Sequence, residues 1–167
     1  MRHQPRLTGN AVATTHGISY VGADGLGPLD GPDAALVAMA DATLSSRIMV
    51  VSPGALEIAC KLLQLGCTEV AMVRLADRPR PKQADIVLVP ALAAGDVLDR
   101  AAAFARRVLA PLGTAVFRLD SETSADEMQR ALAVLQGLGF SGLPQRCPAG
   151  ARLLRADVPL FGRLTCA

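Results

Sequence analysis

Short, uninterrupted runs of apolar residues alternate with amphipathic helical patterns over most of this 167-residue sequence. The clearest runs are Ile48–Val51 and Ile86–Val89, which are too short for helices and contain no polar residue. A continuous apolar run of this length is typical of a strand that is buried on both faces. Because parallel strands need long crossover connections, strands that alternate with helices predict an α/β sandwich around a mostly parallel sheet.

The predicted elements place one α/β domain, residues 32–167, after an extension, residues 1–31, that is rich in glycine and proline. The extension contains one short apolar run, Ile18–Val21, that favours a strand. We expect helices over 32–43, 53–65, 95–109 and 125–136, parallel strands over 48–51, 69–75, 84–89 and 114–119, and a C-terminal antiparallel hairpin over 142–147 and 151–158.

Local signals mark the ends of two of these helices. Ser52 is expected to cap the second helix, with Pro53 at its first position. Ser124 and Glu127 have the spacing of a capping box at the start of the fourth helix. Apolar residues at helical spacing predict the core face of the second helix: Leu56, Ala59, Cys60 and Leu63.

Composition excludes several classes of protein. Hydrophobic residues make up 51% of the chain and charged residues 19%, which excludes disorder for most of it. A net charge of +2 does not favour broad electrostatic capture of nucleic acid. We find no apolar, uncharged stretch long enough to span a membrane, and no apolar core behind the N-terminal arginines that would make a secretory signal. We therefore expect a cytoplasmic protein with no membrane association.

The cysteines and histidines do not have the spacing of a metal site. Zinc needs about four convergent ligands, often in C-x-x-C pairs. No such pair occurs here, and the two histidines are distant in sequence from the cysteines, which are Cys60, Cys67, Cys147 and Cys166. We expect free thiols in a reducing compartment and no bound metal.

Four segments, taken in order, resemble a class I S-adenosylmethionine-dependent methyltransferase. They are Ile48–Ala55 at the first cofactor motif, Ala84–Pro90 at the fourth strand, Val108–Val116 at a helix–loop–strand unit, and Leu135–Phe140 before the terminal hairpin. The resemblance covers residues 32–161 and implies a reduced Rossmann-like sandwich with a C-terminal antiparallel hairpin. Fold alone does not define function, however, because function depends on the site.

The resemblance implies a first motif with an acidic residue and about three glycines, because the backbone must approach the cofactor closely. It places Val50 at the acid, and Ser52, Gly54 and Leu56 at the glycines, so one glycine remains. At the end of the second strand the family has an acid that accepts the ribose hydroxyls, and Arg74 stands there. Arginine has only donors, which suit a phosphate or carboxylate instead.

A third departure is a deletion. Only eight residues, 76–83, separate Leu75 from Ala84, where the family has a helix and another strand. A parallel crossover usually needs a dozen or more residues, so we expect an extended loop here. The resemblance then implies that the adenine side of the pocket is missing or is rebuilt by the N-terminal extension. The deletion should also uncover part of the sheet.

The candidate cofactor pocket comprises Ser52, Gly54, Ala55 and Arg74, beside Asp77 as a possible replacement for the missing acid. The sequence also predicts a basic loop at the same edge of the sheet, made of Arg74, Arg78, Arg80 and Lys82. This loop indicates contact with phosphate, nucleic acid or an acidic partner. The absence of interleaved aromatic residues weakens the case for single-stranded nucleic acid.

Two functions follow from these observations, and no catalytic residue is assigned for either. The first is a pseudoenzyme, a binding or scaffold module that has kept the methyltransferase fold and lost S-adenosylmethionine binding, and so has no cofactor. The alternative is a small divergent S-adenosylmethionine-dependent methyltransferase of unknown substrate, in which Ser52 and Gly54 hold the methionine end. For either, the apolar composition predicts a homo-oligomer or a protein partner. We expect the uncovered part of the sheet to be covered by the N-terminal segment, a second copy or a partner.

Overall fold

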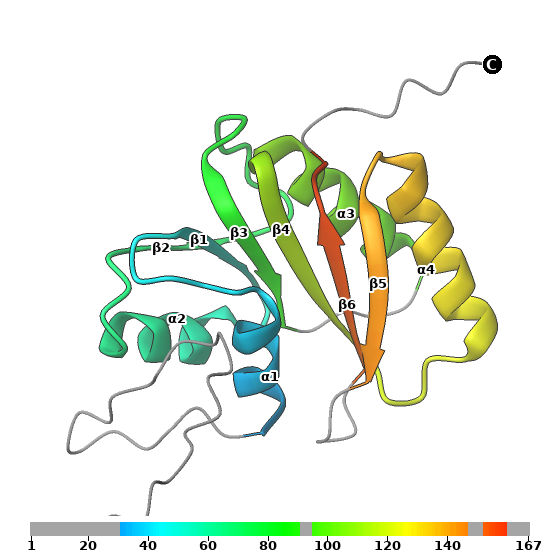
Figure 1. Cartoon of the computed structure of the whole chain (residues 1–167), viewed down its shortest axis with the longest axis horizontal. Coiled ribbons are helices and arrows are strands. Elements are labelled where there is room, and N and C mark those ends of the chain that lie inside the picture. Colours follow the sequence, from blue (N-terminus) through cyan, green and yellow to red (C-terminus); the bar gives the residue numbers. More distant parts are fainter. Residues whose placement is uncertain (1–30, 91–94, 147–151, 160–167) are drawn as a thin grey trace, which may run out of the picture.

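The structure, a computed structural model, describes residues 31–90, 95–146 and 152–159. Helices and strands alternate along it, as Figure 1 shows. Its elements are α1 (Gly31–Met39), β1 (Arg47–Val51), α2 (Ala55–Gln64), β2 (Glu69–Val73), β3 (Ala84–Val89), α3 (Asp96–Val108), β4 (Leu109–Leu119), α4 (Ala125–Gly137), β5 (Ser141–Arg146) and β6 (Arg152–Asp157).

The strands form one six-stranded sheet in the order β2-β1-β3-β4-β6-β5. Strands β1, β2, β3 and β4 are parallel, whereas β6 is antiparallel to both β4 and β5. The predicted α/β fold with a mostly parallel sheet and a terminal antiparallel hairpin is therefore confirmed. Within the sheet, the last strand of the hairpin, β6, lies between β4 and the first strand of the hairpin, β5 (Figure 1).

The sheet separates two hydrophobic cores. Helices α1 and α2 pack on one face, over Ile48, Val50 and Leu88, among others. Helices α3 and α4 pack on the other face, over residues that include Met49 and Val87. Because side chains alternate between the faces of a strand, β1 and β3 supply both cores from consecutive residues. This explains why both strands are continuous apolar runs.

Helix ends differ from the sequence-based expectations at three places. Helix α1 ends at Met39 and not at residue 43, and β4 begins at Leu109, directly after α3. Helix α2 begins at Ala55, so the expectation that Ser52 caps it is wrong. Its N-cap is Gly54 at φ +84°, a left-handed conformation that glycine adopts without the strain that a side chain brings. The peptide between Ser52 and Pro53 is cis.

Helix α2 does not bury the face that its sequence predicts. The residues it buries are Ala55, Ile58, Ala59 and Leu62. Leu56 and Leu63 are instead 64% and 52% exposed, and Cys60 is exposed as well. The helix has apolar residues on two adjoining flanks, and helical spacing alone does not say which flank the sheet covers.

Two arginines hold α1 against the sheet. Arg118 of β4 pairs with Asp33 in the first turn of α1 at 2.6 Å. Arg155 of β6 pairs with Asp41 just beyond the helix at 2.5 Å, and it also donates to the Met39 carbonyl at 2.8 Å. Helix α1 is thus tied to two strands near its two ends. At the other side of the sheet, α4 begins with the predicted capping box of Ser124 and Glu127.

Among the described residues, none of the helices combines the length and the apolar character that crossing a bilayer demands.

The ion pair between Arg47 and Asp85 joins the amino ends of β1 and β3. The arginine donates to both carboxylate oxygens, at 3.0 and 2.6 Å, and the Arg47 backbone N–H adds a third bond at 3.0 Å. Hydrogen bonds from the Arg47 guanidinium hold the pKa of Asp85 below its usual value. Asp85 is therefore a structural residue that stabilises the parallel pairing.

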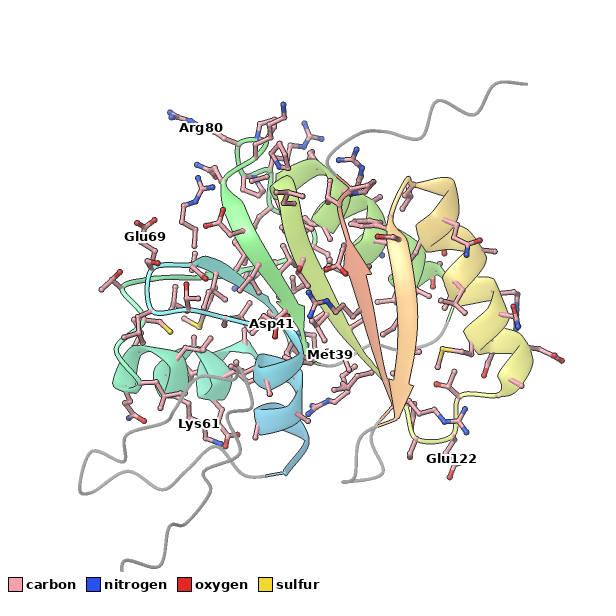
Figure 2. All side chains as sticks on the ribbon, viewed as in Figure 1. Met39, Asp41, Lys61, Glu69, Arg80 and Glu122 are labelled. Carbon is pink, nitrogen blue, oxygen red and sulfur yellow. The ribbon has the colours of Figure 1, made fainter. Side chains whose placement is uncertain are left out.

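We expect the stabilising effect of Asp85 to depend on pH. Because its pKa is lowered in the folded state, the carboxylate stabilises the protein above its unfolded pKa of about 3.9, and this stabilisation is lost as pH falls through the lower folded value. Urea unfolding should show that Asp85→Asn is less stable than wild type at pH 7 and that the gap narrows toward pH 3. Glu122→Gln, which neutralises an exposed loop carboxylate (Figure 2), is the control. A gap of constant size would contradict the expectation.

Candidate functional site

A hollow of about 700 Å³ lies where β1 and β2 end, beside the first turn of α2. In open α/β sheets this carboxyl end is where ligands bind. The hollow is lined by Ser52, Pro53, Gly54, Ala55, Leu56, Glu57, Met72, Val73, Arg74 and Asp77. The structure thus brings together all four residues of the predicted pocket: Ser52, Gly54, Ala55 and Arg74.

The turn between β1 and α2 forms one wall of the hollow. The Ser52 backbone N–H donates to the Val73 carbonyl at 2.8 Å, so this turn is fastened to the end of β2. A Cβ atom on Gly54 would lie 3.5 Å from Cγ of Pro90, the buried residue that follows β3. The left-handed Gly54 caps α2 without a side-chain hydrogen bond. The first backbone N–H groups of the helix therefore have no side-chain acceptor at the N-cap.

Arg74 and Asp77 form the opposite wall. Arg74 directly follows β2 and is exposed. Its backbone N–H donates to the Asp77 carboxylate at 2.7 Å, and the Asp77 N–H donates back to the Arg74 carbonyl at 2.9 Å. The carboxylate of Asp77 is therefore engaged in closing a turn. Asp77, the predicted replacement for the missing acid, therefore lies in the hollow, but its carboxylate already accepts a backbone hydrogen bond.

Leu56 projects where a glycine would leave open space. It stands on the first turn of α2, is 64% exposed, and lines the hollow together with Met72 of β2. Val50 of β1, at the place of the acid in the resemblance, is fully buried beneath α1 and α2. The site therefore lacks a carboxylate at either place where the resemblance implies one. The hollow thus combines apolar residues such as Leu56 and Met72 with one arginine, Arg74, and with the carboxylates of Glu57 and Asp77.

The expectation that the whole basic loop lies at this edge is wrong. Only Arg74 lines the hollow. The loop passes the end of α3, where the Arg107 guanidinium donates to the Asp77 carbonyl at 3.1 Å and the Lys82 N–H donates to the Arg107 carbonyl at 3.3 Å. Figure 2 shows Arg80 beside the amino end of β3. The reason is topological: consecutive parallel strands oblige their connection to return from the carboxyl end to the amino end.

The described residues contain no group of three or more His, Cys, Asp or Glu side chains that could hold a metal ion. Cys60 is an exposed free thiol, whereas Cys67 is buried, and burial raises the pKa of the Cys67 thiol. Cys147, Cys166 and both histidines lie outside the described residues, as does the short apolar run Ile18–Val21.

Comparisons with solved structures identify the fold. Two similar structures are a 1,6-didemethyltoxoflavin-N1-methyltransferase from Burkholderia thailandensis (TM-score 0.55, 15% identity, covering 76% of each chain) and the YcgJ protein from Bacillus subtilis (TM-score 0.52, 10% identity, covering 76% of this chain and 97% of that one). A third is a precorrin-6y C5,15-methyltransferase from Geobacter metallireducens (TM-score 0.50, 13% identity, covering 76% and 87%).

This chain therefore has the fold of the class I S-adenosylmethionine-dependent methyltransferases, in a reduced form. At this level of identity the likeness concerns the fold alone. No model of a known protein family matches the sequence, and no curated protein matches it.

The left-handed conformation of Gly54 predicts that replacing this glycine lowers the stability of the protein. Gly54→Ala should lower the free energy of unfolding by about 1–2 kcal/mol, because an L-residue is strained at this positive φ. The nearest contact of the new Cβ, at 3.5 Å, is ordinary, so strain and not collision is the cause. Gly137→Ala, at the end of α4 with nothing within 4 Å, is the matched control and should cause no loss. Equal effects in urea unfolding would contradict this assignment.

Proposed function

We propose that this protein is a binding or scaffold module with a methyltransferase fold that does not bind S-adenosylmethionine. The observation that carries the proposal is the chemistry of the hollow at the ends of β1 and β2. Leu56 and Met72 give it an apolar lining, and Arg74 is its one cation. Its two acids are already engaged: Asp77 accepts the Arg74 backbone N–H, and Glu57 is paired with Lys61 at 2.9 Å. A site for the cofactor would need hydrogen-bond acceptors for the ribose and free backbone for the methionine end.

The arginine is the first obstacle. A ribose diol recognised through both hydroxyls needs an acceptor, and a guanidinium offers only donors. Asp77 is the acid in the hollow nearest to Arg74 in sequence, and its carboxylate accepts the Arg74 backbone N–H. Turning the Asp77 carboxylate toward a ligand would break that bond and leave the turn with only the hydrogen bond from the Asp77 N–H to the Arg74 carbonyl. Glu57, the other acid of the hollow, is paired with Lys61 at 2.9 Å. Neither acid can therefore accept the ribose hydroxyls without giving up a contact that it already makes.

The leucine and the short loop are the second and third obstacles. A cofactor that approached the backbone of α2 would have to displace the Leu56 side chain, which stands in the hollow. Residues 74–83 form turns and irregular backbone, with no helix or strand. The sheet ends at β2 on this side, so nothing among the described residues supplies a wall beyond the edge strand. All three obstacles fall on the same site.

A second candidate function is a divergent methyltransferase. The retained hollow at the carboxyl ends of the parallel strands favours it, since this is the ligand-binding end of such sheets. One of the similar structures, the Burkholderia thailandensis enzyme, was solved with S-adenosylhomocysteine bound. In this alternative, the part of the hollow at Ser52 and Gly54 would hold the methionine end.

Titration distinguishes the two functions. We expect isothermal calorimetry to give no measurable heat of binding for S-adenosylmethionine or S-adenosylhomocysteine. A thermal-shift assay with either compound in excess should leave the midpoint of unfolding unchanged. The alternative predicts a clear stabilisation, about 2.7 kcal/mol at 100 times the dissociation constant. A micromolar dissociation constant that Gly54→Ala or Arg74→Ala weakens would overturn the proposal.

A further inference from the structure

The edge of the sheet at β2 combines an open strand with exposed apolar side chains. Among the described residues, strand β2 is the last strand on its side of the sheet and has one neighbour, β1 (Figure 1). Met72 of β2 is 56% exposed, and the flank of α2 that the sheet leaves uncovered has the exposed residues Leu56, Cys60 and Leu63. These four residues are called the edge patch below.

The edge patch is continuous from the helix to the strand. Residues 56, 60 and 63 are separated by four and three positions, so they lie on one flank of α2. Leu56 and Met72 line the same hollow, which places this flank toward the outer edge of β2 and not toward α1. Val70, on the same face of β2 as Met72, already packs under α2. Apolar surface therefore extends over the helix and the strand edge together.

Within the part of the chain that the structure describes, the backbone of β2 leaves two residues free to pair outward. The Val73 carbonyl accepts from Ser52, so Val73 directs its polar groups toward β1. In a strand these groups alternate in direction, which means that Val70 and Met72 direct their N–H and C=O groups away from the sheet. Arg74 is the next outward residue, and its N–H is already bonded to Asp77. The available edge is thus centred on Ala71.

We propose that this edge binds a second copy of the same chain, with the two β2 strands antiparallel about a twofold axis at Ala71. A twofold axis perpendicular to the sheet keeps side chains on matching faces only if a residue lies opposite itself. With Ala71 opposite Ala71 of the second copy, Val70 faces Met72 of the second copy and Met72 faces its Val70. The two outward residues of each strand then satisfy each other, and no hydrogen-bonding group of either is left over.

Charge and size favour this self-pairing. Glu69 falls opposite Val73 of the second copy, and Arg74 falls opposite its Thr68, so no like charges face each other. Alanine at the centre permits close approach on the face toward α3. A partner with a longer strand could not form a further backbone hydrogen bond to the Arg74 N–H, because the Asp77 carboxylate already accepts it. The edge is therefore complementary to itself over the length that it offers.

The same axis brings the two α2 helices together. Both lie on the same face of the combined sheet, each packed over its own β2. The uncovered flanks then face each other across the axis, and Leu56, Leu63 and Met72 of both copies are withdrawn from water. Cys60 stands near the middle of α2, as Ala71 does in β2, so the two Cys60 thiols are expected close to the axis. This inference does not depend on the loss of cofactor binding.

Solution mass tests the proposal. Light scattering of the full chain should give twice the monomer mass of 17.3 kDa. Met72→Lys places two like charges at the axis and should raise the dimer dissociation constant about tenfold or more. Leu112→Lys is the matched control, because Leu112 is 61% exposed but lies on β4, away from this edge, and the variant should remain dimeric. Circular dichroism checks that both variants fold.

Cross-linking tests the geometry. In the full chain with Cys147→Ser and Cys166→Ser, a short bismaleimide should join two copies through Cys60, since Cys67 is buried. Adding Cys60→Ser should abolish the product, and adding Met72→Lys should reduce it strongly. A monomeric mass at the highest soluble concentration overturns the proposal. So does a dimer that Met72→Lys leaves intact, or one that gives no Cys60 product, because each shows that another surface makes the contact.

Discussion

The central strands β1 and β3 carry the constraint on which the rest of the fold depends. They pair in parallel register and belong to both hydrophobic cores at once, with Met49 facing α3 and Val50 facing α2. A strand that is buried on both faces cannot move without disturbing two layers of helices. The Arg47–Asp85 pair fixes these two strands at their amino ends. The hollow beside Ser52 therefore begins at the carboxyl end of a strand, β1, that is packed on both faces.

Much of this architecture could be predicted from the sequence, since apolar runs, capping boxes and helix-ending glycines are local signals. The capping box of Ser124 and the C-terminal hairpin followed from such signals, as did the absence of a strand between β2 and β3. Helix α2 shows where local signals end. Its apolar residues occupy more of the circumference than the sheet covers, so only the packed structure shows that Leu56 and Leu63 remain in water.

The sequence predicted only part of the site, because it fixes the positions of residues that follow a strand but not the path of a loop. Residues that follow one strand, such as Ser52 and Gly54, have positions that the topology fixes, and they lie in the hollow as expected. The basic loop has to cross from one end of the sheet to the other, and a sequence does not reveal the path it takes. In the structure, two hydrogen bonds join the loop to Arg107 along that path. Likewise, the turn that engages the Asp77 carboxylate depends on loop geometry and not on spacing.

The two arginine clamps on α1 also determine where the preceding chain enters the domain. Asp33 is fastened to Arg118 near the carboxyl end of β4, so residue 31 stands at the end of the sheet that holds the hollow. The chain before residue 31 therefore joins the domain at the carboxyl ends of the parallel strands and not at their amino ends. The anchoring of one helix thus sets which end of the sheet the preceding chain meets first.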